Sequence, residues 1–165
     1  MSQACVLGAG SWGTTLAVHL AGAGHSVSLW GHPAAELLDL KTHRENRKFL
    51  PGIPLPAAIK VQPELELALE GAEVTLFVVP CHAVREVGRG VAASGRRSLW
   101  VSAAKGLEHG TLERMSEVLA ETLGDPDPVV LTGPSHAEEV SRGVPTSVVA
   151  AAREESRARA VQQLL

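Results

Sequence analysis

Cysteine is scarce in this chain, and neither sign of charge dominates it. The only cysteines among 165 residues are Cys5, in an apolar run that predicts a strand, and Cys81, just after a later run. This placement favours two free thiols in a reducing compartment over a disulfide framework. The formal net charge of −3 gives no broad attraction to nucleic acid or to an anionic membrane, so any phosphate site must be local.

Long apolar runs and export signals are also lacking. No run approaches the ~18–20 apolar residues of a membrane span. The N-terminus has no charged segment leading into an apolar stretch and a cleavage site. The sequence therefore predicts a cytoplasmic protein with no membrane span and no nucleic-acid partner. The length and the 45% hydrophobic content fit one globular domain over residues 1–165.

What the sequence does contain is a glycine motif near its start. Gly8, Gly10 and Gly13 form G-x-G-x-x-G between an apolar run at 4–7 and helical apolar spacing over 14–21. Strand, glycine turn and helix in that order is the context of the dinucleotide-binding fingerprint. The first glycine allows the tight turn, the second lets a pyrophosphate approach the backbone, and the third lets the helix pack closely. The start of the helix then offers N–H groups and a positive dipole end to the phosphates.

The rest of the chain alternates short apolar runs with helical patterns. Further strands are expected over 26–30, 73–80, 98–102, 129–131 and 146–151. Further helices are expected from 33 to 40 and over 63–69, 83–93, 111–123, 137–140 and 154–165. This alternation predicts an α/β fold with a doubly wound, mostly parallel, Rossmann-like sheet. It favours a nucleotide site over the alternative of a glycine turn that merely joins a strand to a helix.

The expected second strand ends without a carboxylate. An NAD site usually has Asp or Glu there, about 20 residues after the fingerprint, to hold the ribose 2′-hydroxyl. This chain has Trp30-Gly31-His32-Pro33, and the nearest carboxylate is that of Glu36. A site without the acid does not repel a 2′-phosphate, and His32 can donate a hydrogen bond to one; the alternative is a solvated loop histidine. We therefore expect NADP or NAD as cofactor, with NADPH accepted at least as well as NADH.

Three other candidates follow expected strands, where ligands bind in open parallel sheets. Lys105 can meet a phosphate or a developing alkoxide as a point charge, or it can be a solvated loop lysine. Gly133 and Ser135 stand at a helix start, where N–H groups and a hydroxyl can face an anionic ligand. The alternative is that Ser135 only caps that helix.

Two motifs of other chemistries are incomplete. His136 and Glu138 match the H-x-E of zinc deaminases, but no P-C-x-x-C follows. Cys81 and His82 are neighbours on a helix and do not face one another as a nucleophile and its base would. We expect neither a metal site nor a thiol nucleophile.

With these motifs the chain resembles the NAD(P)-dependent glycerol-3-phosphate dehydrogenases of bacterial type. The resemblance rests on segments in one order, namely 8–14, 29–32, 49–56, 78–83, 102–107 and 132–140. It implies reversible reduction of dihydroxyacetone phosphate to sn-glycerol 3-phosphate in support of glycerophospholipid synthesis. It implies cofactor contacts by Gly8, Gly10, Ser11, Trp12, Gly13, His32, Phe49, Lys105 and Ala137. It implies substrate contacts by Lys105, Gly133 and Ser135, with Lys105 in the catalytic centre.

Two departures from the family stand out. Pro33 replaces a residue that is basic in many members, which weakens the expected NADP preference. The family also has a second, all-helical domain that supplies the catalytic lysine and most of the grip on the substrate phosphate. We expect this chain to be the cofactor-binding domain alone, inactive by itself, with the apolar residues 161, 164 and 165 packing against the other domain. We also expect it to self-associate through the exposed end of the sheet. The resemblance also allows a homodimer.

Alternatives remain open at this stage. One is a stand-alone nucleotide-binding module with a regulatory or sensing role. Another is a related two-domain reductase of the 6-phosphogluconate or ketopantoate type. The motifs at 102–107 and 132–140 argue against this second alternative.

Overall fold

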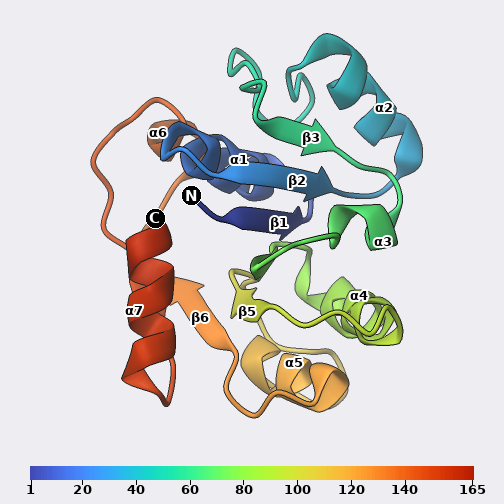
Figure 1. Ribbon diagram of the computed structural model, residues 1–165, viewed down its shortest axis with the longest axis vertical. Helices are drawn as coiled ribbons and strands as arrows, with labels where there is room; N and C mark the ends of the chain where they lie inside the picture. Colours follow the sequence, from blue (N-terminus) through green and yellow to red (C-terminus); the bar gives the residue numbers. More distant parts are fainter.

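Seven strands form one sheet with helices on both faces, in a computed structural model that describes residues 1–165 (Figure 1). The strands are β1 (Gln3–Leu7), β2 (Ser26–Trp30), β3 (Ile59–Val61), β4 (Val74–Phe77), β5 (Leu99–Ser102), β6 (Val129–Thr132) and β7 (Val149–Ala151). The helices are α1 (Ser11–Gly22), α2 (Ala34–His43), α3 (Leu65–Ala68), α4 (Cys81–Ala93), α5 (Met115–Leu123), α6 (Ala137–Val140) and α7 (Glu155–Leu164).

The order across the sheet is β3-β2-β1-β4-β5-β6-β7, and every pair is parallel except β6–β7. The chain thus builds outward from β1 in one direction and then returns to add β4 on its other side. This is the doubly wound arrangement, with a topological switch point between β1 and β4. The predicted mostly parallel, Rossmann-like sheet is confirmed.

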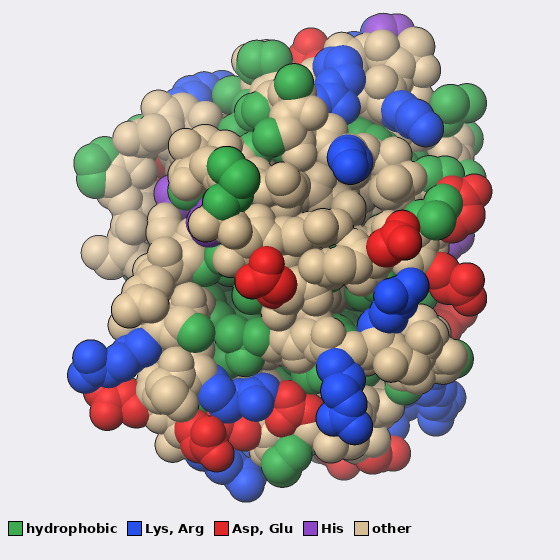
Figure 2. All heavy atoms as spheres, viewed as in Figure 1, with side chains coloured by type: hydrophobic (Ala, Val, Ile, Leu, Met, Phe, Trp, Pro, Cys, Tyr) green, Lys and Arg blue, Asp and Glu red, His purple; other side chains and the backbone are tan.

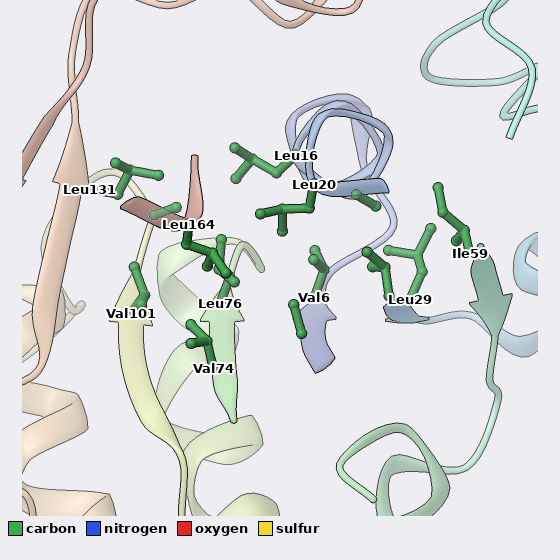
Figure 3. Close-up of a cluster of buried hydrophobic side chains, with 14 of the residues drawn as sticks. Val6, Leu16, Leu20, Leu29, Ile59, Val74, Leu76, Val101, Leu131 and Leu164 are labelled. Atoms are coloured by element: carbon green, nitrogen blue, oxygen red, sulfur yellow. The ribbon is translucent and has the colours of Figure 1, made fainter. Parts of the chain in front are cut away.

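The central strands read as continuous apolar runs because both of their faces are covered. In β1, Ala4 and Val6 point into one hydrophobic cluster, whereas Cys5 and Leu7 point into the other. The first cluster holds 21 buried residues and is closed by side chains of α1, α2 and α7. Figure 3 shows Leu16 and Leu20 of α1 reaching toward this face of the sheet. The second cluster holds 14 buried residues and is closed by α3, α4 and α5.

The local structure differs from expectation at three points. The strand β3 was not expected, because Ile59-Lys60-Val61 is too short to show a pattern by itself; its pairing with β2 defines it. The helix expected over 111–123 begins only at Met115. Leu112 has φ +61° and is 71% exposed, since a bridge between Leu107 and Arg114 closes a turn there. The last strand is also shorter than expected.

The expected role of the C-terminal helix is corrected by its packing. Val161 and Leu164 are buried in the first cluster rather than facing outward, and Figure 3 shows Leu164 among Leu76, Val101 and Leu131. His25 Nε2 lies 3.1 Å from the Leu164 carbonyl oxygen. The end of α7 therefore completes this domain's own core instead of waiting for another domain to cover it.

The surface is mixed in charge, and Figure 2 shows basic and acidic side chains interspersed along the lower part of one face. A bilayer-crossing helix is absent, since none of the seven combines the necessary length with the necessary apolar character. Both cysteines are free, as predicted. Burial raises the pKa of the Cys5 thiol to about 12, so this thiol stays neutral.

Candidate functional site

A cavity of about 1170 Å³ opens at the carboxyl ends of the central strands. It is lined by every residue expected to contact the cofactor, namely Gly8, Gly10, Ser11, Trp12, Gly13, His32, Phe49, Lys105 and Ala137. Of the two remaining substrate candidates, Ser135 lines the cavity and Gly133 does not. A Cβ at Gly133 would lie 2.9 Å from the Ser147 carbonyl oxygen, so close packing requires glycine there.

The fingerprint turn is tightly packed at both ends and open in the middle. A Cβ at Gly13 would lie 1.7 Å from the Gly8 carbonyl oxygen. A Cβ at Gly8, whose φ is +127°, would lie 2.7 Å from the Val78 backbone. A Cβ at Gly10 would meet nothing within 4 Å. The outer glycines let the turn pack on α1 and on the end of β4, whereas the middle glycine leaves free space at the cavity wall.

The start of α1 presents N–H groups that the helix does not use. The first turn bond runs from the Thr14 N–H to the Gly10 carbonyl oxygen over 2.9 Å, so the amides of Ser11, Trp12 and Gly13 precede the helical ladder. No side chain caps the helix, and its first turn holds no acidic residue. These amides and the positive end of the helix dipole make this part of the wall suited to an anion.

Asn46 ties a distant loop to the fingerprint turn, and sequence analysis missed it. Its side chain donates hydrogen bonds to the Ala9 carbonyl oxygen over 2.9 Å and to Thr14 Oγ1 over 2.7 Å. Its Oδ1 accepts a hydrogen bond from the Phe49 N–H over 3.1 Å. Asn46 is 5% exposed. One buried amide thus fixes the position of Phe49 relative to the fingerprint.

The expected second-strand end is aromatic and histidine-bearing, as the sequence indicated. The rings of Trp30 and His32 meet edge to face with their centroids 5.0 Å apart, and Trp30 Nε1 donates to the Pro63 carbonyl oxygen over 3.1 Å. Phe49 is 40% exposed beside the cavity. A flat ring and an imidazole therefore flank the wall where β2 ends.

Lys105 is the only lysine or arginine that lines the large cavity. It is exposed and forms no hydrogen bond or ion pair within the chain. Its neighbour Gly106 has φ +108° and packs against Cys81, whose Sγ would lie 3.2 Å from an added Cβ. The backbone here is fixed, while the ammonium group is free to meet a ligand.

The loop after Lys105 is anchored by Arg85 of α4, a second residue that sequence analysis missed. The Arg85 guanidinium donates to Glu108 over 2.7 Å and 2.9 Å and to Glu113 over 3.0 Å, and it pairs with Glu121 at 2.8 Å. Thr111 Oγ1 donates to Glu108 over 2.7 Å. These bonds hold the pKa of Glu108 at about 2, with the Arg85 hydrogen bond as the largest cause.

The alternative role of Ser135, capping the helix that follows it, is not observed. The helix α6 starts at Ala137 with His136 at its N-cap, and no side chain caps it. The backbone of α6 is instead tied to α1, since Thr15 Oγ1 donates to the Ala137 carbonyl oxygen over 3.1 Å. Ser135 lines the cavity with no hydrogen bond of its own hydroxyl inside the chain, which leaves that hydroxyl available to a ligand.

No group of three or more His, Cys, Asp or Glu side chains is gathered so as to hold a metal ion. What the cavity offers is a row of helix amides, the rings of His32 and Phe49, one free ammonium group and the free hydroxyls of Ser11 and Ser135. This set suits a large ligand with phosphates at one end and flat rings beyond them.

Comparison with known proteins identifies the family. A family model described as the NAD-dependent glycerol-3-phosphate dehydrogenase N-terminus matches residues 3–158. The chain belongs to this family. The recognition made from its motifs is thereby confirmed.

Relatives with this enzyme name align with nearly the whole of this chain. The chain is 44% identical over 166 residues to the glycerol-3-phosphate dehydrogenase [NAD(P)+] of Desulfitobacterium hafniense, covering 100% of this chain and 47% of that protein. It is 47% identical over 165 residues to the enzyme of the same name from Prosthecochloris aestuarii, covering 96% and 49%. The crystal structure of glycerol-3-phosphate dehydrogenase from Coxiella burnetii aligns with a TM-score of 0.94 at 33% identity, covering 99% of this chain and 50% of that one. The chain spans about half the length of these family members.

Proposed function

We propose that this chain is the coenzyme-binding domain of an NAD(P)-dependent glycerol-3-phosphate dehydrogenase. The reaction is the reversible reduction of dihydroxyacetone phosphate to sn-glycerol 3-phosphate, as the family's name implies. The observation that carries the proposal is the large cavity at the switch point of the sheet, whose wall is the start of α1. Ligands of doubly wound folds bind at this place.

The residues present fit a dinucleotide. The open space beside Gly10 admits a pyrophosphate against the backbone, and the amides of Ser11, Trp12 and Gly13 are free to bind it. No acidic side chain of the first turn opposes the negative charge. In this assignment His32 and Phe49 hold the adenosine half, while Ala137 and Lys105 lie along the nicotinamide half.

The coenzyme supplies the hydride, and the chain's residues bind and orient what receives it. We assign Lys105 to the substrate oxygen on which negative charge develops, because a fixed cation in a closed site stabilises such charge strongly. We assign Ser135 and the neighbouring backbone at Gly133 to the substrate itself. The family's helical domain contributes the proton-transferring lysine and most of the phosphate contacts.

Both coenzymes fit the end of β2, because no carboxylate follows Trp30 directly. We propose that NADPH is accepted at least as well as NADH. The product is the backbone of glycerophospholipids, so we also propose a role in their synthesis in the cytoplasm.

Fluorescence titration of the chain with NADH and NADPH tests the coenzyme assignment. We expect both to bind weakly, since only part of the site is present, and clear selectivity for NADH would contradict the proposed preference. An assay with dihydroxyacetone phosphate tests the division of labour between the domains. We expect no turnover by this chain alone. Turnover above background, with host enzyme excluded, would place the proton-transferring group inside residues 1–165.

A further inference from the structure

A second, smaller cavity of about 260 Å³ adjoins the large one. The two share Ala9, His32 and Phe49 in their linings, so they are neighbours where β2 ends. The rest of its lining comes mainly from α2 and from the following loop, which carries Lys48. In a dinucleotide fold the ribose of the adenosine half lies at the end of the second strand. The small cavity is therefore where a substituent on the 2′-oxygen would project.

Three charged side chains other than His32 line this small cavity, and each already has a partner. Glu36 of α2 pairs with Lys48, which also lies 4.8 Å from the centroid of the Phe49 ring. Asp39 of α2 pairs with Arg47 and His43, neither of which lines the cavity. Glu36 and Lys48 thus place one anion and one cation side by side in the lining of the small cavity.

We propose that the Glu36–Lys48 pair determines how the chain distinguishes a 2′-hydroxyl from a 2′-phosphate, an inference that rests on the proposed coenzyme function. With a 2′-hydroxyl, Glu36 accepts the hydrogen bond that the missing strand-end carboxylate usually accepts. With a 2′-phosphate, Lys48 leaves Glu36 and donates to the phosphate instead. The pair serves both coenzymes by exchanging partners.

Exposure makes this exchange feasible. The Lys48 side chain is 62% exposed and that of Glu36 is 33% exposed, and solvent-exposed ion pairs contribute little stability. A hydrogen bond between an ammonium group and a phosphate is charge-assisted and short. The ligand therefore gains more from Lys48 than the protein loses. Asp39 does not compete for Lys48, since Arg47 and His43 already hold it.

The test uses the adenosine halves of the two coenzymes, 5′-AMP and 2′,5′-ADP, which differ only by the 2′-phosphate. Calorimetric titration of the chain with each gives a ratio of dissociation constants. Glu36→Gln should shift this ratio about tenfold toward 2′,5′-ADP, because it removes a repulsive carboxylate and frees Lys48. Lys48→Met should shift the same ratio about tenfold toward 5′-AMP, because it removes the proposed donor to the 2′-phosphate.

Two further variants separate this role from a general effect of charge. Lys41→Met removes an exposed cation of α2 that lines neither cavity and forms no ion pair, and it should leave the ratio within about twofold of the unchanged chain. The double variant Glu36→Gln with Lys48→Met should lie between the two single variants. Circular dichroism before each titration establishes that the variant is folded.

Two failures are distinguishable. If both nucleotides bind but the ratio is unmoved by Glu36→Gln and Lys48→Met, or moves equally with Lys41→Met, the inference is overturned while the coenzyme assignment stands. If the folded, unchanged chain binds neither nucleotide, the proposed function itself fails.

Discussion

The side-chain amide of Asn46 bridges the carbonyl oxygen of Ala9, at 2.9 Å, and the hydroxyl of Thr14, at 2.7 Å. Both acceptors belong to the fingerprint turn and the first turn of α1, and Thr14 is fully buried. Oδ1 of the same side chain accepts a hydrogen bond from the Phe49 N–H over 3.1 Å. The proposed phosphate and adenosine parts of the site are thus joined by a single buried group.

Replacement of Asn46 by alanine should lower both stability and coenzyme affinity. It leaves the part-buried carbonyl oxygen of Ala9 and the buried hydroxyl of Thr14 without their partner, which costs about 2–3 kcal/mol in the free energy of unfolding. Urea denaturation and NADH titration measure the two effects. Thr42→Ala on α2 is the control, because that hydroxyl is exposed and bonds only within its own helix. An Asn46→Ala variant as stable as Thr42→Ala would contradict the structural role.

The glycines of the fingerprint turn should respond differently to alanine. Gly13→Ala places a Cβ 1.7 Å from the Gly8 carbonyl oxygen, so the turn must move and the variant should be strongly destabilised or unfolded. Gly10→Ala meets nothing within 4 Å and has φ −76°, which alanine adopts easily. It should keep a melting temperature within a few degrees of the parent but bind NADH at least tenfold more weakly, because its methyl group fills the space assigned to the pyrophosphate.

Equal loss of stability in both variants would show that the middle glycine is also a packing position. Unchanged NADH affinity in Gly10→Ala would remove the pyrophosphate from this part of the wall. Thermal melts monitored by circular dichroism, run beside the titrations, separate the two results.

Much of the fold follows from local pattern, and the misses share a cause. The central strands are buried on both faces, so their apolar runs are visible without knowledge of their neighbours. By contrast, β3 is defined by pairing with β2, and the late start of α5 is set by the bridge from Leu107 to Arg114. The apolar end of α7 was assigned to another domain, because sequence cannot tell which surface an amphipathic helix covers.

The candidate site divides in the same way. Ten of the eleven expected residues line the large cavity, and only Gly133 does not. Glycine spacing and strand ends indicated some of them, whereas Phe49 and Ala137 came from the family resemblance alone. Asn46 and Arg85 were missed because the bonds that tie them to the site reach partners 23 to 37 residues away in sequence, Ala9 and Thr14 for Asn46 and Glu108 for Arg85. Hydrogen bonds of that reach leave no periodic signal. A polar residue in a charged segment looks solvated until the fold brings its partners to it.

The Arg85–Glu108 pair should make stability depend on acid pH. The pKa of Glu108 is lowered from 4.5 to about 2 in the folded chain, chiefly by the Arg85 hydrogen bond. Because the folded pKa lies below the unfolded one, the pair stabilises the fold fully above pH ~4.5, and this contribution is lost as the pH falls toward 2. Glu108→Gln should therefore be less stable at pH 7 and show a flatter decline between these values.

Denaturation midpoints of the parent and Glu108→Gln across pH 2–7 measure this difference. Glu155→Gln is the matched control, since it removes an exposed ion pair with Arg159 on α7. It should change stability little at any pH. Parallel pH curves for the parent and Glu108→Gln would contradict the assignment.

Lys105→Ala should abolish most of the catalysis without affecting the fold. The side chain is exposed and unpaired within the chain, so its removal should leave the melting temperature unchanged and coenzyme affinity changed only modestly. Turnover should fall by about two orders of magnitude or more, by analogy with the loss of one preorganised donor to a developing negative charge.

The assay is dihydroxyacetone phosphate reduction by this domain joined to the helical domain of its family. Lys41→Ala, an exposed lysine of α2 outside both cavities, is the control and should keep full turnover. If Lys105→Ala retained near-normal turnover, the free ammonium group in the cavity would be a solvated loop residue and the substrate oxygen would have to be held from elsewhere.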